Sequence, residues 1–183
     1  MTGFRRVDEA LVHQGYIWRL ATAEFESPDG ERFRRDIVRS PGAVGVVPIW
    51  MDSEGVPGVL LVRQFRAAYE EAIIEIPAGM RDVPGEPPEE TARRELVEEI
   101  GMQAGRLVHL VDLYPSPGMT DSVTTVFLAQ DLRETEQNLQ GPEERHLEVL
   151  NVPLSEALSW VLSGVIRDAK TVAGLLLAER LLR

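Results

Sequence analysis

Glutamates and arginines gather in the segment 79–102, GMRDVPGEPPEETARRELVEEIGM. Pro88 suits the first turn of a helix, and Gly101 suits the left-handed residue that commonly ends one. These signals predict a helix from about Pro88 to Ile100. The charged residues of the segment are therefore expected on one short helix, and their spacing decides which of them lie together.

Three of the glutamates share one face of this predicted helix. At about 100° per residue, Glu95, Glu98 and Glu99 fall within an arc of roughly 100°, and a neighbouring arc is apolar. Ionised carboxylates at this spacing repel one another by about a few tenths of a kcal/mol. Mg²⁺ prefers oxygen ligands and shares its shell with water and substrate phosphates. The pattern therefore indicates a metal site that holds a phosphate, and the alternative is a solvated acidic face with ordinary ion pairs.

The order of these residues resembles the signature of the Nudix hydrolases. That signature reads G, five residues, E, seven residues, R-E-U-x-E-E-x-G-U with U apolar, and here seven residues follow Glu86 before RELVEEIGM at 94–102. One departure is that six residues, not five, separate Gly79 from Glu86. We expect the extra residue to bulge the loop and to leave the helix unchanged. It leaves open where Glu86 lies relative to Arg94, a pair that braces the motif in this family.

Other segments are similar to the ADP-ribose and nucleotide-sugar pyrophosphatases within that family. The resemblance runs from about residue 30 to the end of the chain. The segments that carry it are RSPGAVGVVP at 39–48, VRQFR at 62–66, EIPAG at 75–79, SPG at 116–118 and RDAKT at 167–171. It implies an α/β fold, a Nudix-type α/β/α sandwich with a mixed sheet, preceded by a small N-terminal β-sheet used for dimerisation.

The resemblance also implies roles for the motif residues. Glu95 and Glu99 would bind the metal directly, together with the carbonyl of Ala78, and Glu98 would share a further ion. Arg94 would orient Glu95 or Glu98, with substrate contact as the alternative. We expect Mg²⁺ as the cofactor, and Mn²⁺ is the alternative ion.

Candidate substrate contacts lie outside the motif. Arg66 is a candidate phosphate clamp through its forked donors, or else a surface arginine at a strand edge. Gly118 belongs to a Ser-Pro-Gly turn about sixteen residues past Gly101, the offset at which a proline marks ADP-ribose enzymes in this family. Four residues after that glycine many relatives carry a glutamate that contacts substrate, but Ser122 stands there without charge. Asp121 is the candidate replacement.

The base of the substrate would be held by aromatic and arginine residues. By resemblance to this branch, Tyr16, Trp18 and Arg35 are candidates contributed by the N-terminal sheet of a partner chain. Core packing is the alternative for Trp18 and Trp50.

The catalytic base is expected on a polar loop over residues 131–144, whose composition suits a segment that closes over substrate. Comparison with the branch places Glu143 at the base position, and Glu144 is the near alternative. If neither serves, the remaining candidates are Glu98, Asp121 or a metal-bound hydroxide acting alone.

Composition limits the remaining classes of function. The chain of 183 residues has a net charge of −11, which argues against nucleic-acid binding because that needs a basic surface. It has no cysteine, which excludes disulfides, thiol catalysis and zinc-thiolate sites. No apolar run approaches the roughly 18 residues of a membrane span, and the N-terminus does not resemble a signal peptide. We therefore expect a cytoplasmic enzyme with a small-molecule substrate and no membrane partner.

Several strands must position these residues. Strand composition is found at 16–23, 33–38, 43–51, 58–65, 107–113, 123–128 and 147–152. Beyond the motif helix, one helix begins at Leu154 and another covers 168–182, capped by Asp168. We expect a β-sheet segment at 1–42 that forms a homodimer, and a catalytic domain at 43–183.

The function predicted from these features is Mg²⁺-dependent hydrolysis of ADP-ribose to AMP and ribose 5-phosphate. A first alternative is a pyrophosphatase for another nucleoside diphosphate sugar, such as GDP-mannose. A second is a Nudix-fold nucleotide-binding module that has lost catalysis. The complete set of Glu95, Glu98 and Glu99 argues against the second, because a module that only binds has no need to tolerate their repulsion.

Overall fold

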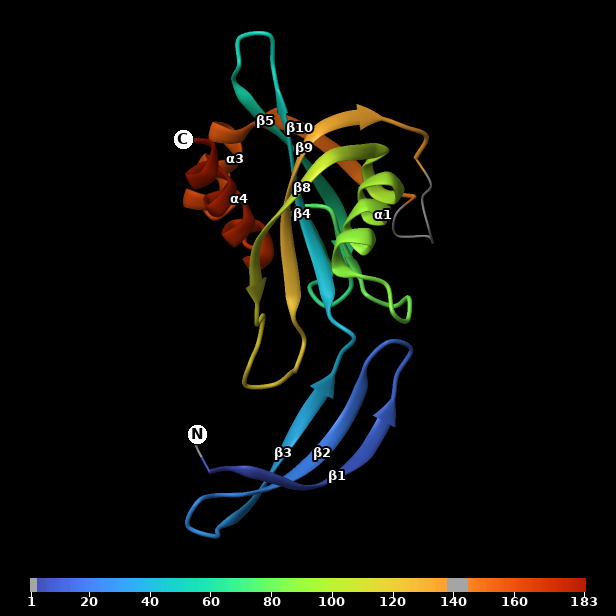
Figure 1. Ribbon diagram of the computed structural model, residues 1–183, viewed down its shortest axis with the longest axis vertical. Coiled ribbons are helices and arrows are strands. Elements are labelled where there is room, and N and C mark those ends of the chain that lie inside the picture. The colour runs from blue at the N-terminus through green and yellow to red at the C-terminus, as the bar shows by residue number, and fades with distance from the viewer. Residues whose placement is uncertain (1–2, 138–144) are drawn as a thin grey trace. The chain divides into compact units, whose positions relative to one another are not determined.

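The computed structural model describes residues 3–137 and 145–183, and the chain divides into two compact units (Figure 1). One unit comprises Met1–Gly42 and Tyr114–Val123, and the other comprises Ala43–Leu113 and Thr124–Arg183. Among the described residues, no helix has both the length and the apolar character needed to cross a membrane.

The first unit is a three-stranded antiparallel sheet. Its order is β1 (Arg5–Gln14), β2 (Arg19–Glu26) and β3 (Arg32–Arg39). The loop 114–123 joins it through a bridge between Val38 and Thr120, where the Thr120 hydroxyl donates to the Val38 carbonyl over 2.7 Å. A segment distant in sequence thus belongs to this unit.

Strand β1 was not predicted from the sequence. It lies at the edge of the sheet and is almost entirely exposed, so it has no buried face to produce an alternating pattern. Its pairing with β2 shifts register between Arg6 and Asp8 and again between Leu11 and His13. Such bulges interrupt the two-residue period by which a strand is recognised.

The second unit is built on a mixed seven-stranded sheet. Its main path is β10 (Glu148–Pro153), β5 (Pro57–Arg66), β4 (Ala43–Met51), β9 (Thr124–Glu134) and β8 (Met102–Leu113). Two short strands complete it, with β6 (Glu71–Glu75) beside β5 and β7 (Ala78–Met80) beside β4. Only β4 and β9 run parallel among the described pairs.

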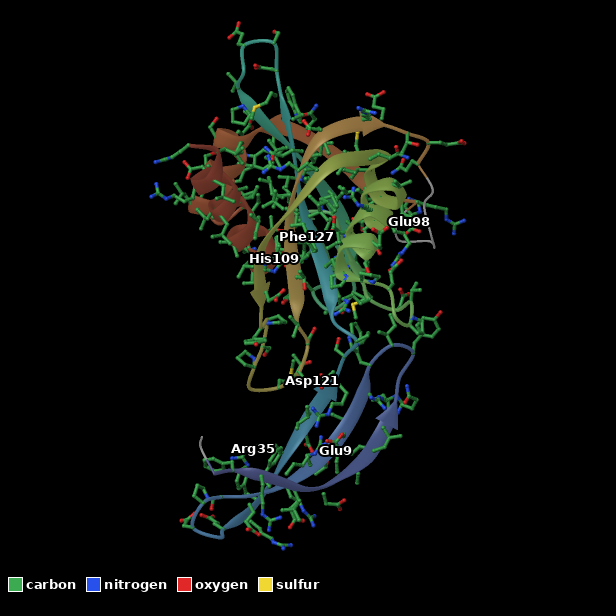
Figure 2. The ribbon with its side chains drawn as sticks, in the orientation of Figure 1. Glu9, Arg35, Glu98, His109, Asp121 and Phe127 are labelled. Atoms are coloured by element: carbon green, nitrogen blue, oxygen red, sulfur yellow. The ribbon has the colours of Figure 1, made fainter. Side chains whose placement is uncertain are left out.

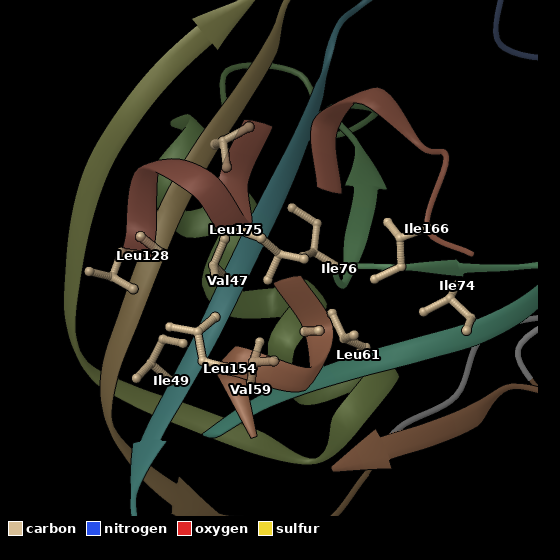
Figure 3. Packing of buried hydrophobic residues seen from close by; sticks show 13 residues of the cluster. Val47, Ile49, Val59, Leu61, Ile74, Ile76, Leu128, Leu154, Ile166 and Leu175 are labelled. Atoms are coloured by element: carbon tan, nitrogen blue, oxygen red, sulfur yellow. The ribbon is translucent and has the colours of Figure 1, made fainter. Parts of the chain in front are cut away.

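Helices cover both faces of this sheet, α1 (Pro88–Ile100) on one and α3 (Leu154–Leu162) with α4 (Ala169–Leu182) on the other (Figure 1). Alternation along β4 creates two cores. Val44 and Val46 pack with Leu96 of α1, while Val47 and Ile49 belong to the core of α3 and α4 (Figure 3). The predicted α/β/α sandwich is therefore confirmed.

The ends of the helices follow the local signals in the sequence. Helix α1 has the predicted bounds, and Gly101 adopts a left-handed conformation with φ of 63°. Asp168 caps α4 by accepting a hydrogen bond from the Thr171 backbone amide. One prediction was too broad: β9 continues to Glu134, so residues 131–134 are strand and not part of the expected loop.

Candidate functional site

Two carboxylates of the motif are buried on helix α1. The side chains of Glu95 and Glu99 lie one helical turn apart, and Oε2 of Glu99 accepts a hydrogen bond from the Ala78 backbone amide over 2.9 Å. Glu98 lies on the same helix and keeps 15% of its side chain exposed (Figure 2). The fold therefore directs the acidic arc of α1 towards the backbone of β7.

Gly79 allows this close approach. An ideal Cβ at residue 79 would lie 1.9 Å from Cδ of Glu95, closer than real Cβ contacts come. Any other side chain at this position would displace the carboxylate. The glycine of the motif is thus required by the position of Glu95.

Arg94 contacts both carboxylates that the sequence offered as its partners. Its Nη1 donates to Glu95 Oε1 and to Glu98 Oε2, each over 2.9 Å. Burial opposes the charge of the guanidinium, but Glu86 and the acidic residues on α1 raise the pKa of Arg94 above its ordinary value. A permanent positive charge thus offsets part of the repulsion among the glutamates.

The extra loop residue does not separate Glu86 from Arg94. The guanidinium lies 3.3 and 3.4 Å from the two carboxylate oxygens of Glu86, and the Thr91 hydroxyl donates to Glu86 over 2.8 Å. Hydrogen bonds from Arg94 and Thr91 lower the pKa of the Glu86 carboxyl. In the same loop, Gly85 has φ of 80° and open space around it.

The donor atoms of this site fit a hard divalent cation. In the part of the chain that the structure describes, no three acidic or histidine side chains come close enough together to hold a metal by themselves. Mg²⁺ does not need such a cage, because it keeps several waters and shares its shell with substrate phosphates. The carboxylate oxygens of buried Glu95 and Glu99, beside those of partly buried Glu98, are donors that Mg²⁺ and Mn²⁺ both accept.

Arg66 lies at the end of β5 and is held by a buried carboxylate. Its Nε and Nη2 donate to Oε1 and Oε2 of Glu75 over 2.6 and 2.9 Å, and Lys170 of α4 also donates to Oε2. Burial raises the pKa of Glu75, but these two cations outweigh it and leave the pKa below its ordinary value. Hydrogen bonds to Glu75 raise the pKa of Arg66 most, and the charge of Glu99 adds to this.

In the first unit, Asp121 is bound to the end of β3. Its Oδ2 accepts from Arg39 Nη1 and its Oδ1 from the Ser40 backbone amide, both over 3.0 Å. Arg39 also pairs with Glu9 on β1, so one guanidinium joins three segments. Burial raises the pKa of Asp121, but these contacts outweigh it and leave the pKa below its ordinary value.

A pocket of about 360 Å³ lies beside this cluster, within the first unit. Arg35 lines it, with its guanidinium carbon 4.8 Å from the centre of the Phe33 ring. Phe33 in turn stacks on Phe25, and the centres of the two rings are 5.7 Å apart. Gly118 and Asp121 line the same pocket, so three of the predicted substrate contacts come together here. Ser122 lies next to them and its backbone amide donates to the Thr120 hydroxyl.

The aromatic candidates differ in exposure. Tyr16 is fully exposed and Trp18 is 53% exposed, both in the first unit. Trp50 instead covers Gly58 of the neighbouring strand, where an added Cβ would lie 2.3 Å from the indole ring. Trp50 is therefore a packing residue, as the alternative interpretation proposed. The candidate bases Glu143 and Glu144 lie outside the described residues.

Sequence analysis gave no role to Glu75 or Lys170. A glutamate inside the apolar run EAIIEIP was the available signal, since a charge in a buried strand requires a partner. One of its partners, Lys170, is 95 residues away and could not be named from spacing.

Comparisons with known proteins agree with this geometry. The NUDIX domain family matches residues 39–175. The ADP-ribose pyrophosphatase of Bacillus subtilis is 39% identical over 167 residues, which cover 91% of this chain and 88% of that protein. The GDP-mannose pyrophosphatase of Cronobacter sakazakii is 34% identical over 175 residues, which cover 90% of this chain and 88% of that protein. A solved structure described as an ADP compounds hydrolase has the same fold, with a TM-score of 0.82 at 23% identity over 98% of this chain and 94% of that one.

Proposed function

The chain belongs to the Nudix family, and we propose that it is a hydrolase that splits the pyrophosphate bond of ADP-ribose into AMP and ribose 5-phosphate. The observation that carries this proposal is the pair of buried carboxylates, Glu95 and Glu99, set against the backbone at Ala78 and Gly79. The relative with the higher identity is an ADP-ribose pyrophosphatase. A GDP-mannose pyrophosphatase at 34% identity supports a related sugar nucleotide as the second candidate.

A divalent cation would be held by Glu95 and Glu99 with the Ala78 carbonyl, and Glu98 would share a further ion. Mg²⁺ is the proposed ion, because it readily binds through few carboxylates and the phosphates of a substrate. When bound, it supplies Lewis-acid stabilisation of negative charge on the phosphate oxygens. Arg94 holds Glu95 and Glu98 in place through its two 2.9 Å hydrogen bonds.

Substrate contacts are proposed for residues outside the motif. Arg66 is proposed to bind a phosphate, since Glu75 fixes its guanidinium while 39% of the side chain stays exposed. Arg35 and Trp18 are proposed to hold the adenine across a homodimer, and Gly118, Asp121 and Ser122 to bound the pocket for the rest of the substrate. A homodimer predicts a mass near twice 20.4 kDa by light scattering, and a fully active monomer would contradict it.

Proton transfer from the attacking water needs a carboxylate that is not committed to the metal. Glu143 is the proposed base and Glu144 its alternative. Glu98 is the remaining candidate on α1, since it is less buried than its two neighbours.

AMP release from ADP-ribose tests the proposed function. The assay compares ADP-ribose with GDP-mannose and other nucleoside diphosphate sugars, with and without Mg²⁺. We expect ADP-ribose to have the highest kcat/KM and activity to require the ion. Preference for GDP-mannose would select the second candidate, and no hydrolysis of any sugar nucleotide would indicate a binding module.

A further inference from the structure

Helix α4 reaches the proposed phosphate-binding Arg66 through a partly buried polar cluster. The cluster consists of Arg66 on β5, Glu75 on β6, and Asp168, Lys170 and Thr171 at the start of α4. The stem of Lys170 passes Gly45, where an added Cβ would lie 3.6 Å from its Cδ. Its ammonium then pairs with Glu75 and, over 3.0 Å, with Asp168.

We propose that Glu75 is a positioning residue that holds Arg66 ready for a substrate phosphate, and that Lys170 holds Glu75 in turn. This inference rests on the proposed function, in which Arg66 binds a phosphate. Neither Glu75 nor Lys170 needs to contact the substrate for this role.

The geometry supports this role for Glu75. Its side chain is only 3% exposed, and both its oxygens accept from the forked donors of Arg66. A bidentate pair of this kind fixes the plane of the guanidinium, which a single hydrogen bond does not. It uses Nε and Nη2, so Nη1 lies on the side of the fork that faces away from the carboxylate.

The role of Lys170 follows from the burial of that carboxylate. A buried charge is retained only where partners compensate it, and Arg66 alone would have to do so if Lys170 were absent. Asp168 balances the second cation, and the Thr171 hydroxyl donates to Asp168 and accepts from the Ile76 backbone amide. The same contacts therefore attach α4 to the backbone that leads into Ala78.

Two opposite effects of Glu75 can be separated by the sign of the change in KM. If Glu75 orients Arg66, its removal should weaken phosphate binding. If it only neutralises Arg66, removal should strengthen phosphate binding, because a positive charge is released. Orientation is the stronger effect here, because the guanidinium is partly exposed and otherwise free to rotate away.

The experiment measures KM, kcat and melting temperature for Glu75→Gln, with Glu148→Gln as the matched control. Glu148 on β10 pairs over 3.0 Å with Arg63, which lies on β5 as Arg66 does, but both of these side chains are exposed. We expect Glu75→Gln to raise KM for ADP-ribose about tenfold with kcat within about threefold of wild type. The control variant should leave both KM and kcat unchanged. A lower KM, or a lower melting temperature with unchanged KM, would overturn the role of Glu75.

A double-mutant cycle tests whether Glu75 acts through Arg66. In an Arg66→Ala background, Glu75→Gln should raise KM no further. If Glu75→Gln raises KM in the Arg66→Ala background by as much as it does in wild type, the proposal is overturned. Glu75→Asp keeps the charge but shortens the side chain, so it should also raise KM and serves if Glu75→Gln does not fold. An unchanged KM in Glu75→Asp would count against the role.

Lys170→Met keeps the stem over Gly45 and removes the ammonium. We expect KM to rise about threefold, and no further rise when it is combined with Glu75→Gln. An unchanged KM would overturn the part played by Lys170. If wild type does not hydrolyse ADP-ribose, the proposed function fails separately. Calorimetric binding of inorganic pyrophosphate then decides the inference: weaker binding in Glu75→Gln alone supports it, and equal binding overturns it.

Discussion

Gly79→Ala should remove activity by moving one carboxylate. The added Cβ would lie 1.9 Å from Cδ of Glu95 and 2.0 and 2.4 Å from its two oxygens. Ordinary contacts begin at 3.4 Å, so the carboxylate must move by about 1.5 Å, the difference between the two distances. That movement also breaks the 2.9 Å hydrogen bond from Arg94.

The magnitude follows from this displacement. A misplacement of about 1 Å in a catalytic group can cost about a hundredfold in rate, so kcat/KM for Gly79→Ala should fall at least that far. Because the clashing atoms are the far end of a flexible side chain, the carboxylate can move away at a small cost in stability, which leaves the protein folded at 25 °C. The assay is AMP release at saturating Mg²⁺, with thermal unfolding measured in parallel.

Gly55→Ala is the matched control. Gly55 has φ of 79° and nothing within 4 Å of an added Cβ, so alanine brings backbone strain without a clash. It should lose stability and keep activity. If Gly79→Ala stays within a few-fold of wild type, the position of Glu95 is not needed for catalysis and the proposed metal site is wrong.

Three further predictions concern single carboxylates. Glu99→Gln still accepts the hydrogen bond from Ala78, so it should fold normally but lose several orders of magnitude in turnover, and near wild-type turnover would contradict its role as a ligand. Glu143→Gln should lower kcat about 10²–10⁴-fold with little change in KM; if it and Glu144→Gln, singly and together, keep kcat within a few-fold, the base lies elsewhere. The pKa of Glu75 lies below its ordinary value of 4.5, so its stabilisation is present above that pH and is lost as the pH falls through the folded-state pKa. The free energy of unfolding of wild type should therefore fall more steeply with decreasing pH than that of Glu75→Gln, so that the difference between the two proteins shrinks. Denaturant unfolding monitored by circular dichroism at a series of pH values measures both slopes, and equal slopes would contradict the prediction.

The sequence alone determined the features that depend on local spacing. The bounds of α1, its left-handed end at Gly101 and its acidic arc all follow from residues within one helix, where geometry is the same in every protein. The cap of α4 by Asp168 is local in the same sense. The order of residues in the motif was equally sufficient to predict the family.

Only the tertiary structure decided which distant residues meet. The loop 114–123 belongs with the N-terminal strands, where Arg39 binds Asp121 across 82 positions of sequence. Glu75 meets Lys170 only because α4 packs on the sheet, and the clash that makes Gly79 necessary exists only because α1 docks beside β7. These contacts have no sequence period, since chain folding and not helix or strand geometry sets their distances. The sequence therefore identifies the chemistry, and the packing of distant segments positions it.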